Sequence, residues 1–358
     1  MTAHRHNAPS AIPVIDGHND LPWKCRSERD GSVAGLDRHQ EQFQTDLPRL
    51  RRGGVAGQFW SAWLPHEFSG AEAVKATMEQ LDLIHRMVRT YPQTLAFSRT
   101  ADDVRTAIEA DRIASLLGIE GGHQMADSLP VLRQYARLGA RYLTLTWNYN
   151  TTWADSATDT PRHGGLSRRG RRLIREMNDI GMVVDLSHVA PATMRHALEA
   201  TRLPVMFSHS SCYALNPHPR NVPDDVTAAL AANGGVQMVT FVPAFLSAEY
   251  WHWERDGATG SAPPVDVACV ADHVEHVRDV AGVDHVGLGG DFDGAGPMPA
   301  GLEDVAGYPS LMAELRARGW AQEDLEKLGF RNVLRVLADN DGAHRAFVRD
   351  EDHEGALA

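Results

Sequence analysis

The sequence has few cysteines, little basic charge and no long hydrophobic run. Its 3 cysteines, Cys25, Cys212 and Cys269, lie far apart without a C-x-x-C pair, which argues against a disulfide framework or a cysteine zinc site and predicts free thiols. With 35 basic against 47 acidic residues, the net charge of −12 argues against nucleic acid as a partner. No segment approaches the roughly 18 apolar residues of a membrane span. The N-terminal MTAHRHNAPSA also lacks the apolar part of a secretory signal, so we expect no membrane partner and a cytoplasmic location.

The composition is that of an ordinary globular protein. The chain has 358 residues, of which 43% are hydrophobic and 23% charged. We expect one domain over residues 1–358, with a core at about 12–340 and short tails at both ends. The one basic run, at 168–175, has no interleaved aromatic residues and is expected to be the solvated start of a helix.

Short apolar runs recur along the chain and predict strands. They lie at 14–21, 55–63, 113–122, 142–147, 182–188, 205–210, 235–241 and 285–293. Between most of them lie segments with helical periodicity, such as 71–91 and 129–139. Alternating strands and helices indicate a parallel sheet covered on both faces, and eight such units match an α/β fold of the (β/α)8 TIM barrel type. The final segment predicts additional C-terminal helices on the outside, and a doubly wound open sheet is the alternative.

Polar side chains stand at the ends of these runs. They are His18, Asp20, Glu120, Trp147, His188, His209, Asp291 and Asp293. A barrel gathers the carboxyl ends of its strands around one mouth, whereas an open sheet spreads them along a line, so this pattern favours the barrel. Two positions apart on one strand, His18 and Asp20 are expected to point the same way. Three imidazoles and two carboxylates meeting there suit zinc, and a carboxylate can bridge two ions.

Several motifs, taken together, resemble those of one enzyme family. GHNDLP, GIEGG, DLSH, SHSS followed by NPHPRNVPDD, and GLGGDFDG resemble the membrane (renal) dipeptidase family, a branch of the amidohydrolase superfamily. The resemblance runs from about Ile12 to about Leu337. It implies a (β/α)8 barrel, two Zn²⁺ per chain and hydrolysis of dipeptides, including those with a C-terminal D-residue, by a hydroxide bridging the metals.

Carried over position by position, the resemblance implies roles for individual residues. It places the metal ligands on five side chains, with Glu120 bridging the two zinc ions: His18, Asp20, Glu120, His188 and His209. Arg220 would grip the substrate carboxylate through a bidentate fork. Asp291 would pass a proton from the attacking water to the leaving amine, with Asp293 as the alternative.

One position departs from the family pattern. Many members have a histidine after the fourth strand, in a T-H-x-x-N context, where this chain reads LTWNYN with Trp147. An indole N–H donates one hydrogen bond but carries no charge, so Trp147 is expected either to contact substrate or to pack the barrel mouth, and Asn148 or Asn150 to substitute. The departure keeps two alternatives open, a related amidohydrolase acting on another carboxylate-bearing amide and a catalytically weakened metal-binding homologue.

The histidines of the helical segments are expected to be exposed and not to bind metal. These are His85, His196, His273 and His276. By analogy with relatives, a homodimer is the expected assembly.

Overall fold

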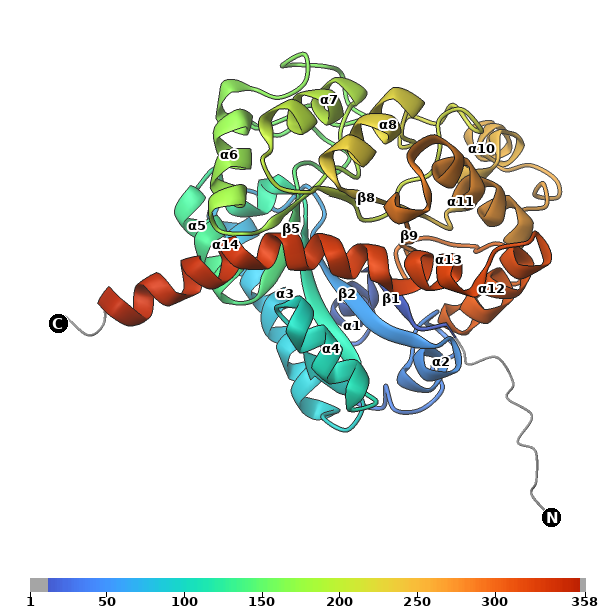
Figure 1. Ribbon diagram of the computed structural model, residues 1–358, viewed down its shortest axis with the longest axis horizontal. Helices are drawn as coiled ribbons and strands as arrows, with labels where there is room; N and C mark the ends of the chain where they lie inside the picture. The colour runs from blue at the N-terminus through green and yellow to red at the C-terminus, as the bar shows by residue number, and fades with distance from the viewer. Residues whose placement is uncertain (1–11, 355–358) are drawn as a thin grey trace.

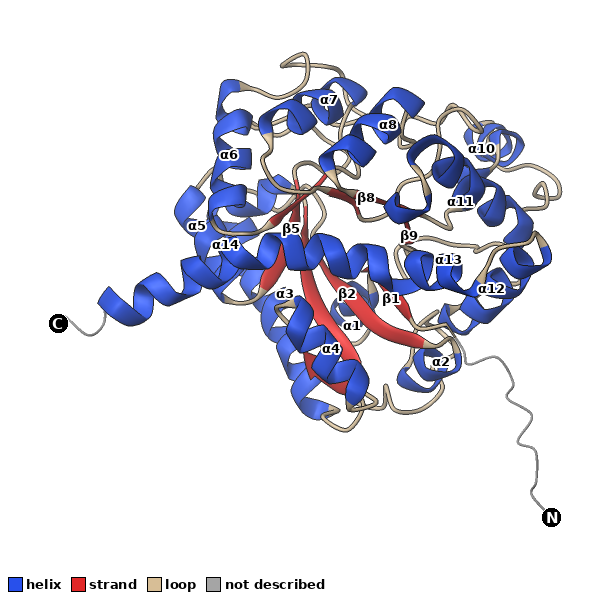
Figure 2. Ribbon diagram, in the orientation of Figure 1, coloured by secondary structure: helices blue, strands red, loops and turns tan. Residues whose placement is uncertain are grey.

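Parallel strands form the interior of the molecule. The structure is a computed structural model and describes residues 12–354. The strands are β1 (Val14–Asn19), β2 (Val55–Trp63), β3 (Leu95–Phe97), β4 (Ile113–Glu120), β5 (Ala140–Thr144), β6 (Val183–Asp185), β7 (Met206–Phe207), β8 (Val236–Val239) and β9 (Val286–Leu288). Figure 2 shows the strands in red inside a layer of blue helices.

Eight of these strands close into a barrel. Their order is β1–β2–β4–β5–β6–β7–β8–β9, and the ring closes because β2 pairs in parallel with β1 on one edge and with β4 on the other. The predicted (β/α)8 barrel is therefore confirmed, and the open-sheet alternative is wrong. The sequence did not predict β3, which pairs with the first residues of β4 before β5 takes over that edge from Leu117 onwards.

Helices cover the outside of the barrel. They are α1 (Leu21–Glu28), α2 (Leu47–Arg52), α3 (Gly70–Thr90), α4 (Ala101–Glu109), α5 (Leu129–Arg137), α6 (Arg168–Asp179), α7 (Pro191–Ala200), α8 (Asp224–Asn233), α9 (Pro243–Leu246), α10 (Ala248–Arg255), α11 (Val267–Ala281), α12 (Tyr308–Ala317), α13 (Gln322–Glu326) and α14 (Asn332–Glu354). The helices predicted at 71–91 and 129–139 are α3 and α5, and the basic run begins α6, where the Ser167 side chain accepts a hydrogen bond from Gly170 N. The expected C-terminal helices are α12 to α14.

The amino end of the barrel is closed by α14, the long red helix of Figure 1. Arg141 at the start of β5 donates a 3.1 Å hydrogen bond to Asp341 of α14 and another of 3.1 Å to the carbonyl of Gly181, just before β6. The second carboxylate oxygen of Asp341 accepts from Ala101 N of α4 at 2.7 Å. Arg141 and Asp341 are both buried, so loss of either partner would leave the other as an uncompensated charge between α14 and the strands.

Most strands end before the apolar runs that predicted them, and three are much shorter than their runs. The runs at 182–188, 205–210 and 285–293 contain only Val183–Asp185, Met206–Phe207 and Val286–Leu288 as strand. Their polar ends therefore lie on loops above the barrel mouth. This placement lets loop geometry aim each side chain separately.

Other expectations concern the rest of the molecule. All 3 cysteines are free thiols, as predicted. Within residues 12–354, no helix is both long enough and apolar enough to cross a membrane.

Candidate metal centre

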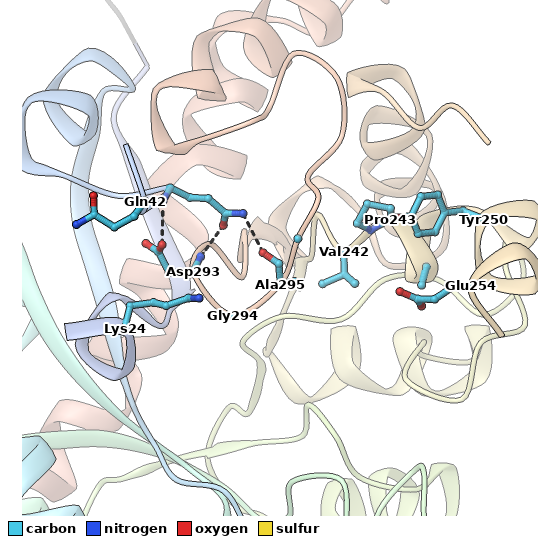
Figure 3. A pocket seen from close by; sticks show the side chains of 12 residues that line it. Lys24, Gln42, Val242, Pro243, Tyr250, Glu254, Asp293, Gly294 and Ala295 are labelled. Atoms are coloured by element: carbon cyan, nitrogen blue, oxygen red, sulfur yellow. Dashed lines mark hydrogen bonds between the residues drawn. The ribbon is translucent and has the colours of Figure 1, made fainter. Parts of the chain in front are cut away.

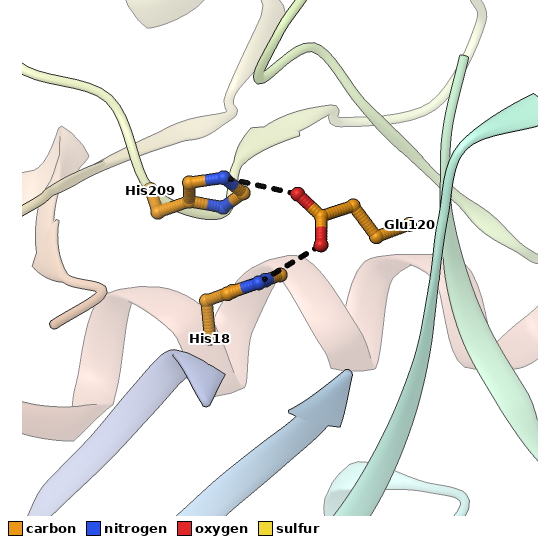
Figure 4. Close-up of side chains that lie close together, drawn as sticks. All are labelled: His18, Glu120 and His209. Atoms are coloured by element: carbon orange, nitrogen blue, oxygen red, sulfur yellow. Dashed lines mark ion pairs between the residues drawn. The ribbon is translucent and has the colours of Figure 1, made fainter. Parts of the chain in front are cut away.

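Glu120, the last residue of β4, lies in the middle of a buried cluster at the barrel mouth. Its Oε2 is 3.3 Å from Nε2 of His18, and its Oε1 is 2.8 Å from Nε2 of His188 and 3.5 Å from Nε2 of His209. Figure 4 shows the Glu120 carboxylate between the rings of His18 and His209. On the other side of His18, its Nε2 is 3.2 Å from Oδ2 of Asp20. The five predicted ligands thus meet in one place.

Local backbone geometry brings these side chains together. His18 lies within β1, but Asp20 follows the strand as the N-cap residue of α1, so the expectation that both stand on one strand is wrong. The turn after β1 nevertheless returns the Asp20 carboxylate to His18. His188 (φ 68°) and Asp291 (φ 62°) both have left-handed backbone, which costs non-glycine residues stability. Such strain at the mouth indicates that loop geometry serves side-chain placement.

A tyrosine that sequence reasoning missed fixes the His18 ring. Nδ1 of His18 lies 3.0 Å from the hydroxyl of Tyr142 on β5, and that hydroxyl donates to the carbonyl of Gly17 at 3.4 Å. The hydroxyl is therefore the acceptor for Nδ1–H, which leaves the Nε2 lone pair facing the carboxylates. A glycine is needed beside this ring, because a Cβ at Gly118 would lie 2.0 Å from Cζ of Tyr142.

The other two imidazoles are oriented in the same sense. Nδ1 of His209 lies 2.8 Å from Oγ of Ser208, whose own proton goes to Asp185 at 2.7 Å. Nδ1 of His188 lies 3.0 Å from the side-chain oxygen of Asn148, which can only accept. All three histidines therefore donate through Nδ1 and present Nε2 to the centre. Sequence reasoning missed Asp185 and Ser208, although a charged residue inside an otherwise apolar strand such as β6 is a signal for such a support.

The donor set fits a metal ion. Nε2 of His188 and Nε2 of His209 are 3.0 Å apart, so their lone pairs face each other. A cation bound by both nitrogens would remove the resulting repulsion. Nε2 of His18 and Oδ1 of Asp20 are buried, and neither has a hydrogen-bond partner among the described residues. Ligand atoms of His18, Glu120 and His209, and of His18, Asp20 and Asp291, lie within 4.8 Å of one another. Imidazole and carboxylate in these two overlapping groups suit zinc.

The electrostatics of the cluster also favour a cation. Burial lowers the pKa of His188 to about 3 and that of His209 well below its ordinary value, so both rings are neutral. Burial alone would raise the pKa of Glu120, but the surrounding histidines lower it well below its ordinary value. Burial would lower the pKa of His18, yet Tyr142, Glu120 and Asp20 raise it strongly. The acids therefore attract positive charge to the point where Nε2 of His18 stands.

Asp291 lies beside the cluster on the loop after β9. Its Oδ1 is 3.9 Å from Nε2 of His18, and burial raises the pKa of Asp291 to about 8. A Cβ at Gly294 would lie 2.2 Å from Asp20 and 2.5 Å from Asp291, so glycine leaves room for both carboxylates. Asp293 points elsewhere, because its Oδ1 accepts from Gln44 N at 2.8 Å. Asp293 therefore connects its own turn to Gln44 and does not face the cluster as Asp291 does.

Arg220 is buried next to the cluster. Its guanidinium makes two long hydrogen bonds of 3.4 Å, to Ser210 Oγ and to the carbonyl of His209, and lies 5.2 Å from the Phe245 ring centroid. Its Nε has no hydrogen-bond partner within residues 12–354. Burial lowers the pKa of Arg220 to about 10, so the group stays charged near neutral pH. A buried cation with donors to spare is suited to bind a carboxylate.

His273, expected to be exposed, is buried instead. Its Nδ1 accepts from Cys212 N at 3.0 Å, and its Nε2 lies 3.1 Å from the carbonyl of Leu246. The ring thus joins the loops after β7 and β8, which also carry Arg220 and Phe245. His85, His196 and His276 are half-buried and belong to neither candidate metal group.

A cavity of about 410 Å³ opens over the cluster. It is lined by Asp20, Trp23, Lys24, Trp63, Glu120, Trp147, Asn148, His188, Arg220, Val242, Phe245, Asp291, Asp293, Gly294 and Ala295. Trp147 lies in this wall, but the structure does not bring Asn150 to it. The Asn150 side chain accepts from Ser156 N at 2.8 Å and donates to the carbonyl of Thr160 at 2.6 Å, so it braces its own loop.

A second cavity of about 530 Å³ adjoins the first across Gly294 and Ala295. Figure 3 shows Lys24 and Asp293 on one side of it and Pro243, Tyr250 and Glu254 on the other. Asp20, Glu120 and His188 line the first cavity, whereas none of the five candidate ligands lines the second, so chemistry at the cluster belongs to the first.

Comparison with known proteins gives matches over nearly the whole chain. The family model described as membrane dipeptidase (peptidase family M19) matches residues 3–347. Dipeptidase verJ of Clonostachys rogersoniana is 44% identical over 338 residues, which cover 91% of this chain and 84% of that protein. Dipeptidase aclJ of Aspergillus oryzae is 43% identical over 349 residues, covering 94% of this chain and 80% of that protein.

Solved structures share the fold over nearly the whole chain. A metallopeptidase from Rhodobacter sphaeroides, liganded with a phosphinate mimic of the dipeptide L-Ala-D-Ala, superposes with a TM-score of 0.83 at 26% identity, covering 92% of this chain and 99% of that one. The dipeptidase AC, a metallopeptidase of family M19, gives a TM-score of 0.81 at 27% identity, with 92% and 99% covered.

Proposed function

This chain belongs to the membrane dipeptidase family and is a metal-dependent hydrolase acting on dipeptides, and we propose that it works with two zinc ions held at the barrel mouth. The observation that supports this most strongly is the meeting of three Nε2 atoms around the Glu120 carboxylate, each with its Nδ1 held by an acceptor. We propose His18, Asp20 and Glu120 as ligands of one ion. Glu120, His188 and His209 would hold the second ion, so the Glu120 carboxylate would be shared by both.

When held by these residues, zinc would supply a water molecule with a pKa lowered toward about 7 and a Lewis acid for the peptide carbonyl. The chain's own residues supply the remaining steps. Bound zinc would favour the ionised form of Asp291, and this carboxylate, 3.9 Å from His18 Nε2 and lining the cavity, would then accept the proton of the attacking water. It then returns this proton to the nitrogen of the leaving residue as the peptide bond breaks.

Arg220 selects the substrate by its carboxylate. The guanidinium lines the same cavity as the cluster, and its long contacts leave N–H groups free to form a bidentate pair with a C-terminal carboxylate. A free carboxylate so close to the reacting carbonyl favours dipeptides over longer peptides. Position 147 of this chain is a tryptophan and not a histidine. We propose that the next residue, Asn148, serves to orient His188.

We also propose that the enzyme accepts a D-residue at the C-terminal position. The support is the likeness to the metallopeptidase liganded with a phosphinate mimic of L-Ala-D-Ala. Residues 12–340 are proposed to act as one catalytic domain. The homodimer and the cytoplasmic location stay predictions.

The test is a dipeptide panel with the zinc-loaded protein. We expect turnover of L-Ala-D-Ala and L-Ala-L-Ala, loss of turnover on chelation and recovery with added zinc. The matched control substrate is L-Ala-D-Ala amide, which lacks the carboxylate and should be cleaved at least about 100-fold less well. Absence of turnover for every dipeptide by protein carrying two zinc ions would contradict the proposal.

Arg220→Met tests the carboxylate contact separately. The variant should raise KM for L-Ala-D-Ala by roughly 100-fold, leave zinc content unchanged and cleave dipeptide and amide with similar efficiency. An unchanged KM would remove Arg220 from the site.

A further inference from the structure

Three half-buried tryptophans form one wall of the cavity over the metal cluster. Trp23 follows β1, Trp63 ends β2 and Trp147 follows β5, and all three line the cavity. Trp63 packs edge-on against both others, with ring centroids 4.7 Å from Trp23 and 5.1 Å from Trp147. We call these three residues the indole wall.

The indole wall lies across the mouth from Arg220. In the strand order of the barrel, β2 and β7 are four positions apart, so they are diametrically opposed. Trp63 ends β2, whereas Arg220 is on the loop after β7 and contacts the carbonyl of His209 there. Glu120 and His188 line the same cavity as both sides.

This arrangement orients a dipeptide. If Arg220 holds the C-terminal carboxylate and the scissile carbonyl lies over Glu120, the N-terminal residue must extend toward β1, β2 and β5. Resting on the proposed dipeptidase function, we propose that the indole wall binds the side chain of the N-terminal residue and makes the enzyme selective for aromatic and large apolar side chains there. Flat indole surfaces bury such side chains and pair with aromatic rings edge-on or offset.

Trp147 is the specific feature of this wall. Its indole lines the cavity and gives the wall an apolar face at this position. The Trp147 ring centroid is 6.3 Å from that of His188, so the wall begins directly beside the metal cluster. A side chain bound there replaces cavity water next to the scissile bond.

The test compares substrates that differ only in the N-terminal side chain. With the zinc-loaded full chain, we expect kcat/KM for L-Phe-D-Ala to exceed that for L-Ala-D-Ala by about tenfold or more. L-Ala-D-Phe should show no such gain, because its ring is on the residue held by Arg220. Equal or lower efficiency with L-Phe-D-Ala would overturn the proposal, whereas failure to cleave any of the three would instead defeat the dipeptidase function.

Substitutions in the wall locate the effect. Trp63→Leu and Trp147→Leu should each lower the Phe/Ala ratio by about fivefold to tenfold, and Trp63→Phe should retain most of it. Trp253→Leu is the matched control, because Trp253 is a half-buried indole on α10 that lies outside this cavity's lining. If Trp63→Leu lowered kcat/KM for both substrates equally, the wall would bind the ammonium group or the backbone instead, and the selectivity proposal would be wrong.

Discussion

The two ends of the barrel are built in opposite ways. At the carboxyl end, Nε2 of His18 lies 3.2 to 3.3 Å from two carboxylates without an aligned hydrogen bond, and His188 and Asp291 have left-handed backbone. At the amino end, buried Asp341 of α14 accepts hydrogen bonds from buried Arg141 at 3.1 Å and from Ala101 N at 2.7 Å. The carboxyl end thus provides ligand atoms at a cost in stability, whereas the amino end provides stability.

We expect the largest effect from a substitution that removes a metal ligand at the carboxyl end. Glu120→Gln removes the charge that faces three imidazoles, so at least one zinc ion should be lost and kcat/KM should fall by roughly 1,000-fold or more. Elemental analysis and steady-state kinetics measure both. Glu72→Gln, on an exposed position of α3, is the control and should change neither. Two tightly held ions in the Glu120→Gln protein would contradict the bridging role.

We expect the next largest effect, on the free energy of unfolding, from a substitution that removes the buried ion pair at the amino end. Asp341→Ala leaves the Arg141 guanidinium buried without its carboxylate, so the free energy of unfolding should fall by about 3–5 kcal/mol. While the variant is folded, its kcat/KM should stay within about twofold of the wild type. Urea unfolding of the metal-free protein measures the loss, with exposed Asp339→Ala on the same helix as control. A folded Asp341→Ala protein without activity would show that the two ends are not independent.

We expect a smaller effect, on zinc affinity, from a substitution behind one of the histidines at the carboxyl end. Ser208→Ala removes the acceptor that holds Nδ1 of His209, so zinc affinity should fall by roughly 10- to 100-fold. Competition with a chelator of known affinity measures this. Ser98→Ala is the control: Ser98 is a buried serine toward the amino end whose hydroxyl donates to the Ala96 carbonyl, and the variant should leave zinc affinity unchanged. Equal affinities in all three proteins would mean that the Ser208 contact does not support the ligand.

The smallest effect concerns pH and lies away from the metal ligands. Burial lowers the pKa of His273 to about 4, while the unfolded chain has the ordinary value of 6.5. Below pH 6.5 the unfolded chain binds a proton that the folded chain does not, so this stability is present above pH 6.5 and is lost as pH falls toward 4. From pH 7 to 5, His273→Gln should lose about 1–2 kcal/mol less than the wild type in metal-free urea unfolding. Identical losses would contradict the assignment.

Much of the carboxyl end could be predicted from the sequence. Polar residues after apolar runs identified His18, Glu120, His188 and His209, because the barrel topology turns sequence positions into neighbours around one mouth. The amino end gave no such signal. Arg141 and Asp341 are 200 residues apart, and only the packing of α14 brings them together.

What the sequence did not predict depends on exact loop paths. Asn148 contacts His188 while Asn150 turns into its own loop, and two asparagines in NYN cannot be told apart without the backbone. Tyr142 was missed because an aromatic residue in a strand normally packs as core. His273 was expected in solvent because helical periodicity does not reveal two backbone partners from distant loops.

We infer that the side chains around Glu120 hold two metal ions. Anomalous diffraction at the zinc absorption edge, from crystals of the zinc-loaded protein, tests it most directly. We predict two peaks about 3.5–4 Å apart, one on each side of the Glu120 carboxylate and each about 2.0–2.2 Å from its imidazole and carboxylate ligands. A single peak, or peaks remote from His18, His188 and His209, would contradict the account.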